Sequence, residues 1–378
     1  TIVQQAISER KPSRLVFDSI GAIRVLSGGM GVRYRQEINL LLQILTESST
    51  TALVLDDIPA HNDDIQFQTL AHGVIKLLYD SYAYADIRTL RVLKLRGLKY
   101  MGGTHNFEVR KGGIAIFPRL QYTQPGNYKE WRIIDSGVAE IDQMLGGGLE
   151  MGTSCLVVGP TGTGKSSLAL LYLHAALQKG EQGAIFLFDE RAATFLYRAE
   201  QLNMDIRPYL DEGQLILKEV STGEYSASEF GQTTRTVVDA GVRVIIIDSL
   251  TGYYHAMKQE DVLLSQMHEI LAYLSRRGVL SLLVVAQHGS LSEQDSTEPN
   301  LSYIADTLLV LRLFEIEGEV RRAVSVRKKR HGNHEKHMRE LLLTPEGIRA
   351  GTSLSFENVL STRPTFKGSR GELLDSDD

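Results

Sequence analysis

The sequence has little of several features that mark other classes of protein. It has one cysteine in 378 residues, Cys155, so no disulfide can form within the chain, and we expect a reducing, cytoplasmic setting. Its longest apolar runs, such as residues 279–286, are much shorter than the roughly 20 residues of a membrane-spanning helix. No basic segment followed by an apolar one opens the chain, so we expect no secretion signal. Because Thr1 stands where an initiator methionine would, we expect a processed chain or a fragment.

A basic excess is also lacking. The formal net charge is −5, whereas proteins whose main task is to bind nucleic acid backbones usually carry an excess of lysine and arginine. The chain is 43% hydrophobic, which is enough to bury a sizeable core and, at this length, to form two domains. We therefore expect a protein that associates with neither membranes nor nucleic acid.

Two parts of the sequence repeat the same features in the same order. An apolar segment ending in Asp-Ser comes first, then a segment with two basic residues two positions apart, and then a short turn ending in Gly-Ile. These features occupy residues 12–20, 90–97 and 112–114 in one part and residues 242–250, 323–330 and 346–348 in the other. Because their spacing is nearly the same, the pattern indicates a tandem duplication.

The second copy is predicted to be the complete one. Short apolar strands alternate with helical segments up to residue 286, which predicts an α/β fold with a mostly parallel sheet covered by helices on both faces. From Thr307 onward, β-rich runs with tight turns predict antiparallel strands at one edge. The predicted domains are residues 1–120, lacking a phosphate-binding lysine, and residues 132–362. A linker at 121–131 and a polar, disordered tail at 363–378 complete the chain.

The clearest motif is a phosphate-binding loop. Residues 159–166 read GPTGTGKS, the Walker A pattern of P-loop NTPases, between a predicted strand and a predicted helix. Glycines at 162 and 164 allow successive N–H groups to turn toward a β-phosphate, and the helix adds the positive end of its dipole. We expect Lys165 to bind the phosphates of ATP and Ser166 to ligate Mg²⁺. The predicted nucleotide-binding residues are Gly159, Pro160, Thr161, Gly162, Thr163, Gly164, Lys165, Ser166, Ser167 and Asp248.

Three acidic residues follow predicted strands and could complete the site. Asp248 ends the strand at 244–247 and is interpreted as the Walker B carboxylate that holds Mg²⁺, although an aspartate at a strand end can also cap a helix. Asp189 and Glu190 end the strand at 184–188. We expect Glu190 to act as the catalytic base with Asp189 in support, and a capping box for the next helix is the alternative.

With these residues in place, the chain resembles the KaiC family of RecA-like ATPases, known from the cyanobacterial circadian clock. The resemblance covers nearly the whole chain and includes residues 141–148 (IDQMLGGG), the P-loop, the acidic pair at 189–190, IDSL at 247–250 and KLRG at 94–97. It implies two RecA-like domains that stack as two rings of a hexamer, with ATP held between neighbouring subunits. The first copy would be a first-ring domain without its amino-terminal half.

The resemblance also implies roles for three further residues. Lys328 and Arg330 match a basic pair that family members supply in trans to the neighbouring subunit's γ-phosphate, although a solvated charge run is the alternative. Clock members phosphorylate themselves on an adjacent Ser-Thr pair, which here corresponds to Ser302 and Tyr303. Because only the serine is kept, Ser302 is a candidate phosphorylation site or an ordinary turn serine.

The leading hypothesis from the sequence is an ATP-hydrolysing, KaiC-like signalling protein, with ATP and Mg²⁺ as cofactors and serine/threonine autokinase activity as an extension. The alternative is a RecA/RadA-like recombination ATPase that binds DNA. The acidic-to-neutral loop at residues 289–300 argues against this, because recombinases line a DNA channel with basic loops. A third hypothesis is an inactive homologue in which nucleotide binding serves only to assemble the ring.

Overall fold

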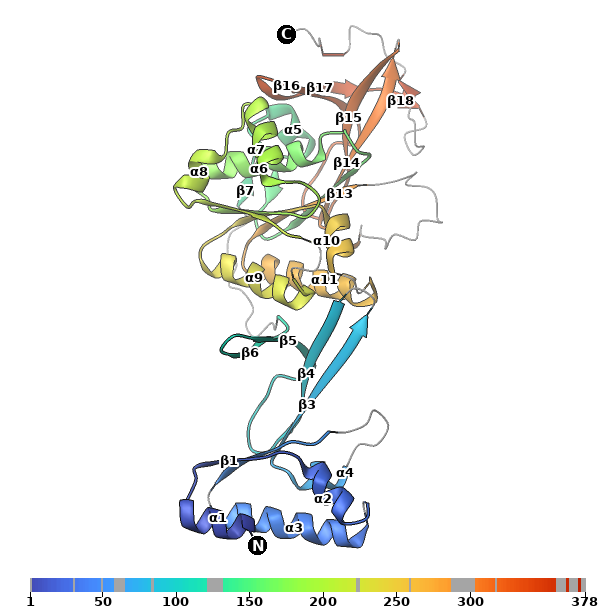
Figure 1. Ribbon diagram of the computed structural model, residues 1–378. Coiled ribbons are helices and arrows are strands. Elements are labelled where there is room, and N and C mark those ends of the chain that lie inside the picture. Colours follow the sequence, from blue (N-terminus) through green and yellow to red (C-terminus); the bar gives the residue numbers. More distant parts are fainter. Residues whose placement is uncertain are drawn as a thin grey trace. The chain divides into compact units, whose positions relative to one another are not determined.

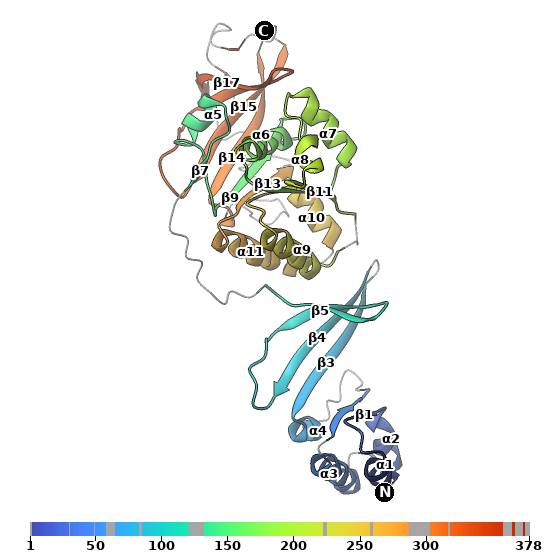
Figure 2. The same cartoon turned by 90° about the vertical axis from the view of Figure 1, so that its left-hand side faces the viewer.

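The structure, a computed structural model, is shown in Figures 1 and 2. It describes residues 2–29, 31–48, 50–57, 65–82, 85–120, 132–221, 225–257, 260–286, 303–316, 318–357, 365–366 and 373–374. The chain divides into two compact units, one of residues 1–77 and 91–103 and the other of residues 78–90 and 104–378. In the described part of the chain, no helix has both the length and the apolar character to cross a membrane.

A nine-stranded sheet forms the centre of the larger unit (Figure 2). The strand order is β11-β10-β12-β13-β9-β14-β15-β16-β17, parallel from β11 to β14 and antiparallel from β14 to β17. Strands β9, β10 and β12 are buried at every position, as expected where helices cover both faces of a parallel sheet. The strands are β9 (Ser154–Gly159), β10 (Gly183–Leu187), β11 (Leu215–Glu219), β12 (Val244–Asp248), β13 (Leu280–Ala286), β14 (Thr307–Ile316), β15 (Glu319–Lys329), β16 (Met338–Thr344) and β17 (Gly347–Leu354).

Helices cover both faces of the parallel part of this sheet (Figure 1). The helices are α5 (Ala139–Met144), α6 (Lys165–Gln178), α7 (Ala192–Gln201), α8 (Arg207–Asp211), α9 (Ala227–Asp239), α10 (Leu250–Met257) and α11 (Glu260–Arg276). One apolar core joins α6 and α7 to Ile246 of β12, and a second joins α9, α10 and α11 to Ile245 and Ile247. Successive residues of a strand point to opposite faces, so β12 contributes to both cores. The predicted α/β fold, with antiparallel strands at one edge, is confirmed.

A buried ion pair links the antiparallel strands and binds one residue of the carboxy-terminal segment. Arg321 on β15 lies 2.9 Å from Glu340 on β16, and both side chains are almost completely buried. The same two side chains hold the backbone of Leu374: its N–H donates to Glu340 at 2.7 Å, and its carbonyl accepts from Arg321 at 2.9 Å. A buried pair is stable only where such additional hydrogen bonds satisfy it. Two short strands that precede Leu374 in the sequence, β18 (Phe356–Glu357) and β19 (Thr365–Phe366), form an antiparallel pair.

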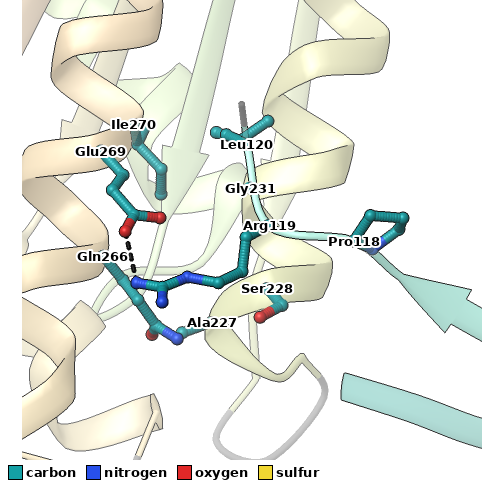
Figure 3. Close-up of a pocket in the computed structure, with 9 residues that line it drawn as sticks. All are labelled: Pro118, Arg119, Leu120, Ala227, Ser228, Gly231, Gln266, Glu269 and Ile270. Atoms are coloured by element: carbon teal, nitrogen blue, oxygen red, sulfur yellow. Dashed lines mark hydrogen bonds and ion pairs between the residues drawn. The ribbon is translucent and has the colours of Figure 1, made fainter. Parts of the chain in front are cut away.

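Ion pairs attach residues 104–120 to helices α9 and α11 within the larger unit. Strands β5 (Thr104–Arg110) and β6 (Gly113–Phe117) form a hairpin, and Arg110 lies 2.6 Å from Glu229 on α9. Arg119 pairs with Glu269 on α11. Residues 118–120 line a small pocket with the two helices, as Figure 3 shows. We assign this pocket a packing role, because the ion pair occupies it.

Residues 2–95 repeat the order of elements that runs from α9 to β15 in the larger unit, with one further helix, α4, that has no counterpart among the described residues. The elements of this repeat are α1 (Ile2–Arg10), β1 (Arg14–Phe17), α2 (Ile20–Leu26), α3 (Val32–Glu47), β2 (Thr51–Val54), α4 (Ile65–Leu70), β3 (Gly73–Tyr82) and β4 (Ala85–Leu95), of which residues 78–90 belong to the larger unit. Strands β1 and β2 pair in parallel, as β12 and β13 do. The Asp18–Ser19 and Asp248–Ser249 peptide bonds are both cis. The repeat seen in the sequence is therefore also a repeat of topology.

One face of the β1–β2 pair differs from its counterpart in the larger unit. Val16 and Leu53 face each other across the two strands and are 62% and 57% exposed. The matching residues, Ile246 and Leu282, are completely buried in the core that includes α6. In the described part of the smaller unit, the apolar face that α6 covers in the larger unit thus remains open to solvent.

Candidate active site

The predicted site residues lie in loops at one edge of the larger sheet, namely the edge formed by the carboxyl ends of its parallel strands. The P-loop follows β9, Asp248 ends β12, and Asp189 and Glu190 follow β10. Because these three strands are parallel, their carboxyl ends meet at the same edge. The fold therefore brings the P-loop, which begins at Gly159, to the same edge of the sheet as Asp248, although the two residues are 89 positions apart in the sequence.

The P-loop has the backbone conformation that its sequence predicts. Gly162 and Gly164 have φ angles of 81° and 92°, in the left-handed region that favours glycine. Gly159 is needed for a different reason, because a Cβ there would lie 2.5 Å from the Leu311 carbonyl oxygen on β14. The Thr163 hydroxyl donates to the Pro160 carbonyl at 2.8 Å and closes the loop. Of the remaining predicted contacts, Thr161 is exposed, whereas Ser167 is buried.

Lys165 is held inside this loop. Its ammonium group donates to the Pro160 carbonyl at 2.8 Å, and the residue is only 8% exposed. Burial lowers the pKa of Lys165, and the charge of Asp248 opposes that effect. A buried ammonium group that has a single carbonyl acceptor among the described residues gains from an anionic partner. The loop is therefore suited to a phosphate.

Asp248 is the residue best suited to hold a cation at this site. It is 7% exposed, and in the described structure its Oδ2 atom is buried without a hydrogen-bond partner. Burial raises the pKa of Asp248, while the Ser166 hydroxyl and the charge of Arg198 act in the opposite direction. A buried, unpartnered carboxylate oxygen beside a hydroxyl is costly unless a cation or donor satisfies it. Ser166 and Asp248 thus fit the oxygen ligands that Mg²⁺ prefers.

Asp189 is fixed by the start of the helix after Asp248. It accepts a hydrogen bond from the Ser249 hydroxyl, and that hydroxyl accepts one from the Gly252 N–H at 2.9 Å. A side chain at position 252 would collide with both carboxylate oxygens of Asp189. The glycine therefore permits Asp189 to approach α10 closely, which supports a positioning role for this acid.

Glu190 is ion-paired in this structure. Its Oε1 atom lies 2.8 Å from Nη1 of Arg198 on α7, and the two side chains are 22% and 34% exposed. The arginine is two helical turns further along the chain, so it reaches back to the loop that carries Glu190. The sequence pattern had suggested a capping box or a catalytic base for this glutamate and did not point to Arg198.

Arg322 is a second residue that sequence reasoning missed. Its Nε atom donates to the Gly162 carbonyl of the P-loop at 3.0 Å, from strand β15 of the same chain. Its neighbour Arg321 belongs to the buried ion pair with Glu340. Nothing in the sequence distinguishes the two adjacent arginines, and only strand alternation separates their roles.

The structure does not bring Lys328 and Arg330 to this edge. Strand β14 begins beside Cys155, the second residue of β9, and Lys328 and Lys329 at the end of β15 face that same beginning. They therefore lie at the amino end of β9, whereas the P-loop follows its carboxyl end, about 13 Å further along the strand. Within one chain, the basic pair therefore lies at the edge formed by the amino ends of the parallel strands, and the P-loop lies at the opposite edge, formed by their carboxyl ends.

The basic pair binds the chain's own backbone here. Lys328 donates to the Ala305 carbonyl at 2.7 Å, and Arg330 donates to the Tyr303 carbonyl at 2.9 Å and pairs with Asp306. Lys94 and Arg96 of the first copy make the same kind of bond to carbonyls at residues 68 and 69. Burial lowers the pKa of Lys328, and the charge of Arg330 adds to that effect.

Lys329, between the two members of the pair, is buried. It lies 2.8 Å from Glu150 and donates to the carbonyls of Leu145 and Gly148, so it fixes the turn before β9. Because the Lys329 side chain is buried, residues 328–330 are not a run of charges that is solvated throughout. Ser302, the loop at 289–300 and the linker at 121–131 lie outside the described residues.

Comparison with known proteins gives a consistent picture across the chain. A family model described as "ATPase: KaiC" matches residues 1–121 and 134–355. Proteins named "Circadian clock oscillator protein KaiC" are similar over 96% of this chain. That of Parathermosynechococcus lividus is 27% identical over 372 residues, which is 68% of its length. Those of Synechococcus elongatus and Nostoc sp. are each 26% identical, over 70% of their lengths.

Proposed function

Because the chain belongs to the KaiC family of ATPases, we propose that residues 132–362 form a complete ATPase domain that binds ATP with Mg²⁺ and hydrolyses it. One observation carries this proposal. The P-loop, the buried and unpartnered Oδ2 of Asp248, and the carboxylate of Glu190 lie at one edge of the sheet. We further propose residues 1–120 as the carboxy-terminal part of a first domain of the same kind. The linker is then 121–131, and the tail is 363–378.

The residues at this edge would divide the chemistry among them. The P-loop N–H groups and Lys165 hold the β- and γ-phosphates. Mg²⁺, held by Ser166 and Asp248, would neutralise charge on the phosphate oxygens when bound. Glu190 accepts a proton from the attacking water as the water oxygen bonds to the γ-phosphorus. The bond from that phosphorus to the bridging oxygen breaks, and ADP and inorganic phosphate are the products.

Glu190→Gln is expected to lower kcat for ATP hydrolysis by about 10²–10⁴-fold, because glutamine cannot accept the proton. The affinity for ATP should change little, since the amide keeps the shape of the side chain. Phosphate release and nucleotide titration measure the two quantities. Glu200→Gln is a matched control, because Glu200 also pairs with an arginine but lies on an exposed part of the same region. Unchanged hydrolysis in the Glu190 variant would reject Glu190 as the base.

We propose that chains assemble into a ring, hexameric as the family resemblance implies, with nucleotide between neighbouring subunits. The position of Lys328 and Arg330 supports this, because they cannot reach the P-loop of their own chain from the opposite edge of the sheet. In a head-to-tail ring, one subunit's edge with the basic pair would face the next subunit's P-loop. The two cations would then stabilise the charge of the γ-phosphoryl group.

We also propose that the chain transfers a phosphoryl group to itself, with Ser302 as the candidate acceptor. The neighbouring residue Tyr303 accepts a hydrogen bond from Arg330 at its carbonyl, so Ser302 directly precedes, in the sequence, a residue that contacts the basic pair. Intact-mass spectrometry after incubation with ATP and Mg²⁺ is expected to show a gain of one phosphoryl group that Ser302→Ala removes. A gain that persists in Ser302→Ala would assign the phosphorylation elsewhere, and no gain in the wild-type chain would reject the kinase activity.

A signalling role for the ATPase completes the proposal, since the relatives are named as circadian clock proteins. The alternative of a DNA-binding recombination ATPase is not favoured by the family match or by the net charge of −5. The single cysteine is completely buried in β9, which is compatible with the cytoplasmic location that we infer.

A further inference from the structure

Arg198 has one side-chain nitrogen whose role the contacts among the described residues do not explain. Its Nη1 atom pairs with Glu190, and its guanidinium carbon lies 5.1 Å from the centre of the Phe195 ring. Phe195 is completely buried, so this contact fixes the guanidinium from one side. The Nη2 atom is buried as well, but it has no hydrogen-bond partner in the described part of the chain.

An unpartnered buried nitrogen on a charged group is costly, and native proteins rarely tolerate it without a reason. The same edge of the sheet holds a complementary case, because Oδ2 of Asp248 is also buried and unpartnered. The two groups carry opposite charges and influence each other electrostatically, yet they form no ion pair. A ligand that combines anionic oxygens with a divalent cation would satisfy both.

We propose that Arg198 is a nucleotide-binding residue of its own chain's site, in which Nη2 donates to an anionic oxygen of the terminal phosphate while Nη1 holds Glu190. This inference rests on the proposed ATPase function. A magnesium–triphosphate complex supplies a cation for Asp248 and phosphate oxygens for Arg198. The planar guanidinium can make both contacts together, because its two nitrogens point in fixed directions.

An exposed ion pair between the end of α7 and α8 differs from this one. Arg207 of α8 lies 2.9 Å from Glu200, with side chains 42% and 49% exposed, and such pairs contribute little to stability. None of the three side-chain nitrogens of Arg207 is among the buried, unpartnered atoms of the described residues. Arg207 therefore provides a control for the loss of an arginine–glutamate pair that has no expected contact with nucleotide.

The inference predicts that Arg198 distinguishes a triphosphate from a diphosphate. Arg198→Met keeps an unbranched side chain over Phe195 but removes the donors. It is expected to weaken binding of a β,γ-imido analogue of ATP by about tenfold or more and ADP binding by no more than about twofold. Arg198→Lys should recover part of the loss, because it keeps the charge without the fork. Arg207→Met should change neither affinity. Titration calorimetry with Mg²⁺ measures all four proteins.

The possible results separate this inference from the function on which it rests. Equal losses for the analogue and ADP, or no loss for either, in Arg198→Met would overturn the role of Arg198 and leave the ATPase standing. If the wild-type chain binds neither nucleotide, the proposed function and the inference both fail. A loss confined to the analogue, partly recovered by lysine, is the result that the inference requires.

Discussion

Lys165→Ala is expected to lower kcat for ATP hydrolysis by about 10²–10³-fold, because the stabilisation of phosphate charge is lost. The ammonium group is buried inside the P-loop, where it has one backbone carbonyl as acceptor. Alanine would remove the only P-loop side chain that can neutralise the β- and γ-phosphates. The remaining N–H groups would still form a weak anion site, so binding should fall without disappearing.

Phosphate release and calorimetric titration with ATP and Mg²⁺ measure these two effects. Lys179→Ala is the matched control, because Lys179 follows the same helix at its other end and pairs with Asp135 at the surface. It should leave both quantities unchanged. Hydrolysis that survives in the Lys165 variant would mean that the phosphates bind elsewhere. Absence of any heat with the wild-type chain would reject the nucleotide site altogether.

The P-loop could be predicted because its signal is local. Two glycines and a lysine at fixed spacing dictate the backbone that the structure shows, with positive φ angles at Gly162 and Gly164. The sheet could be predicted for a similar reason, since short apolar runs between helices leave few alternatives to a parallel, doubly covered arrangement. The internal repeat then indicated which elements recur in the smaller unit.

The partners of individual side chains could not be predicted in the same way. Glu190 was recognised by its place after β10, but its pairing with Arg198 depends on how α7 packs and on which turn faces the loop. The burial of Lys329 among basic residues requires the register of β15 against β14, which includes an irregularity between Leu308 and Leu309. These features come from tertiary contacts that no local pattern encodes.

The separation of the two halves of the catalytic machinery leads to the strongest test of assembly. Lys165 lies at one edge of the sheet and Lys328 and Arg330 lie at the other, so a single chain has an incomplete site if the basic pair is needed. Lys165→Ala and the double variant Lys328→Ala/Arg330→Ala should each be almost inactive alone. The first retains the cations, and the second retains the P-loop.

Mixing the two variants under conditions that allow subunits to exchange should therefore restore hydrolysis. In a randomly mixed ring, about a quarter of the interfaces combine an intact P-loop with an intact basic pair, so activity should recover toward that fraction of wild type. Arg349→Ala, a change to an exposed cation on the edge strand β17, should remain active alone. Sedimentation with and without ATP would check that rings form. Complementation requires only that each subunit contribute its intact half of the site to a neighbour. If rings form but the mixture stays inactive, the basic pair therefore does not act across the interface.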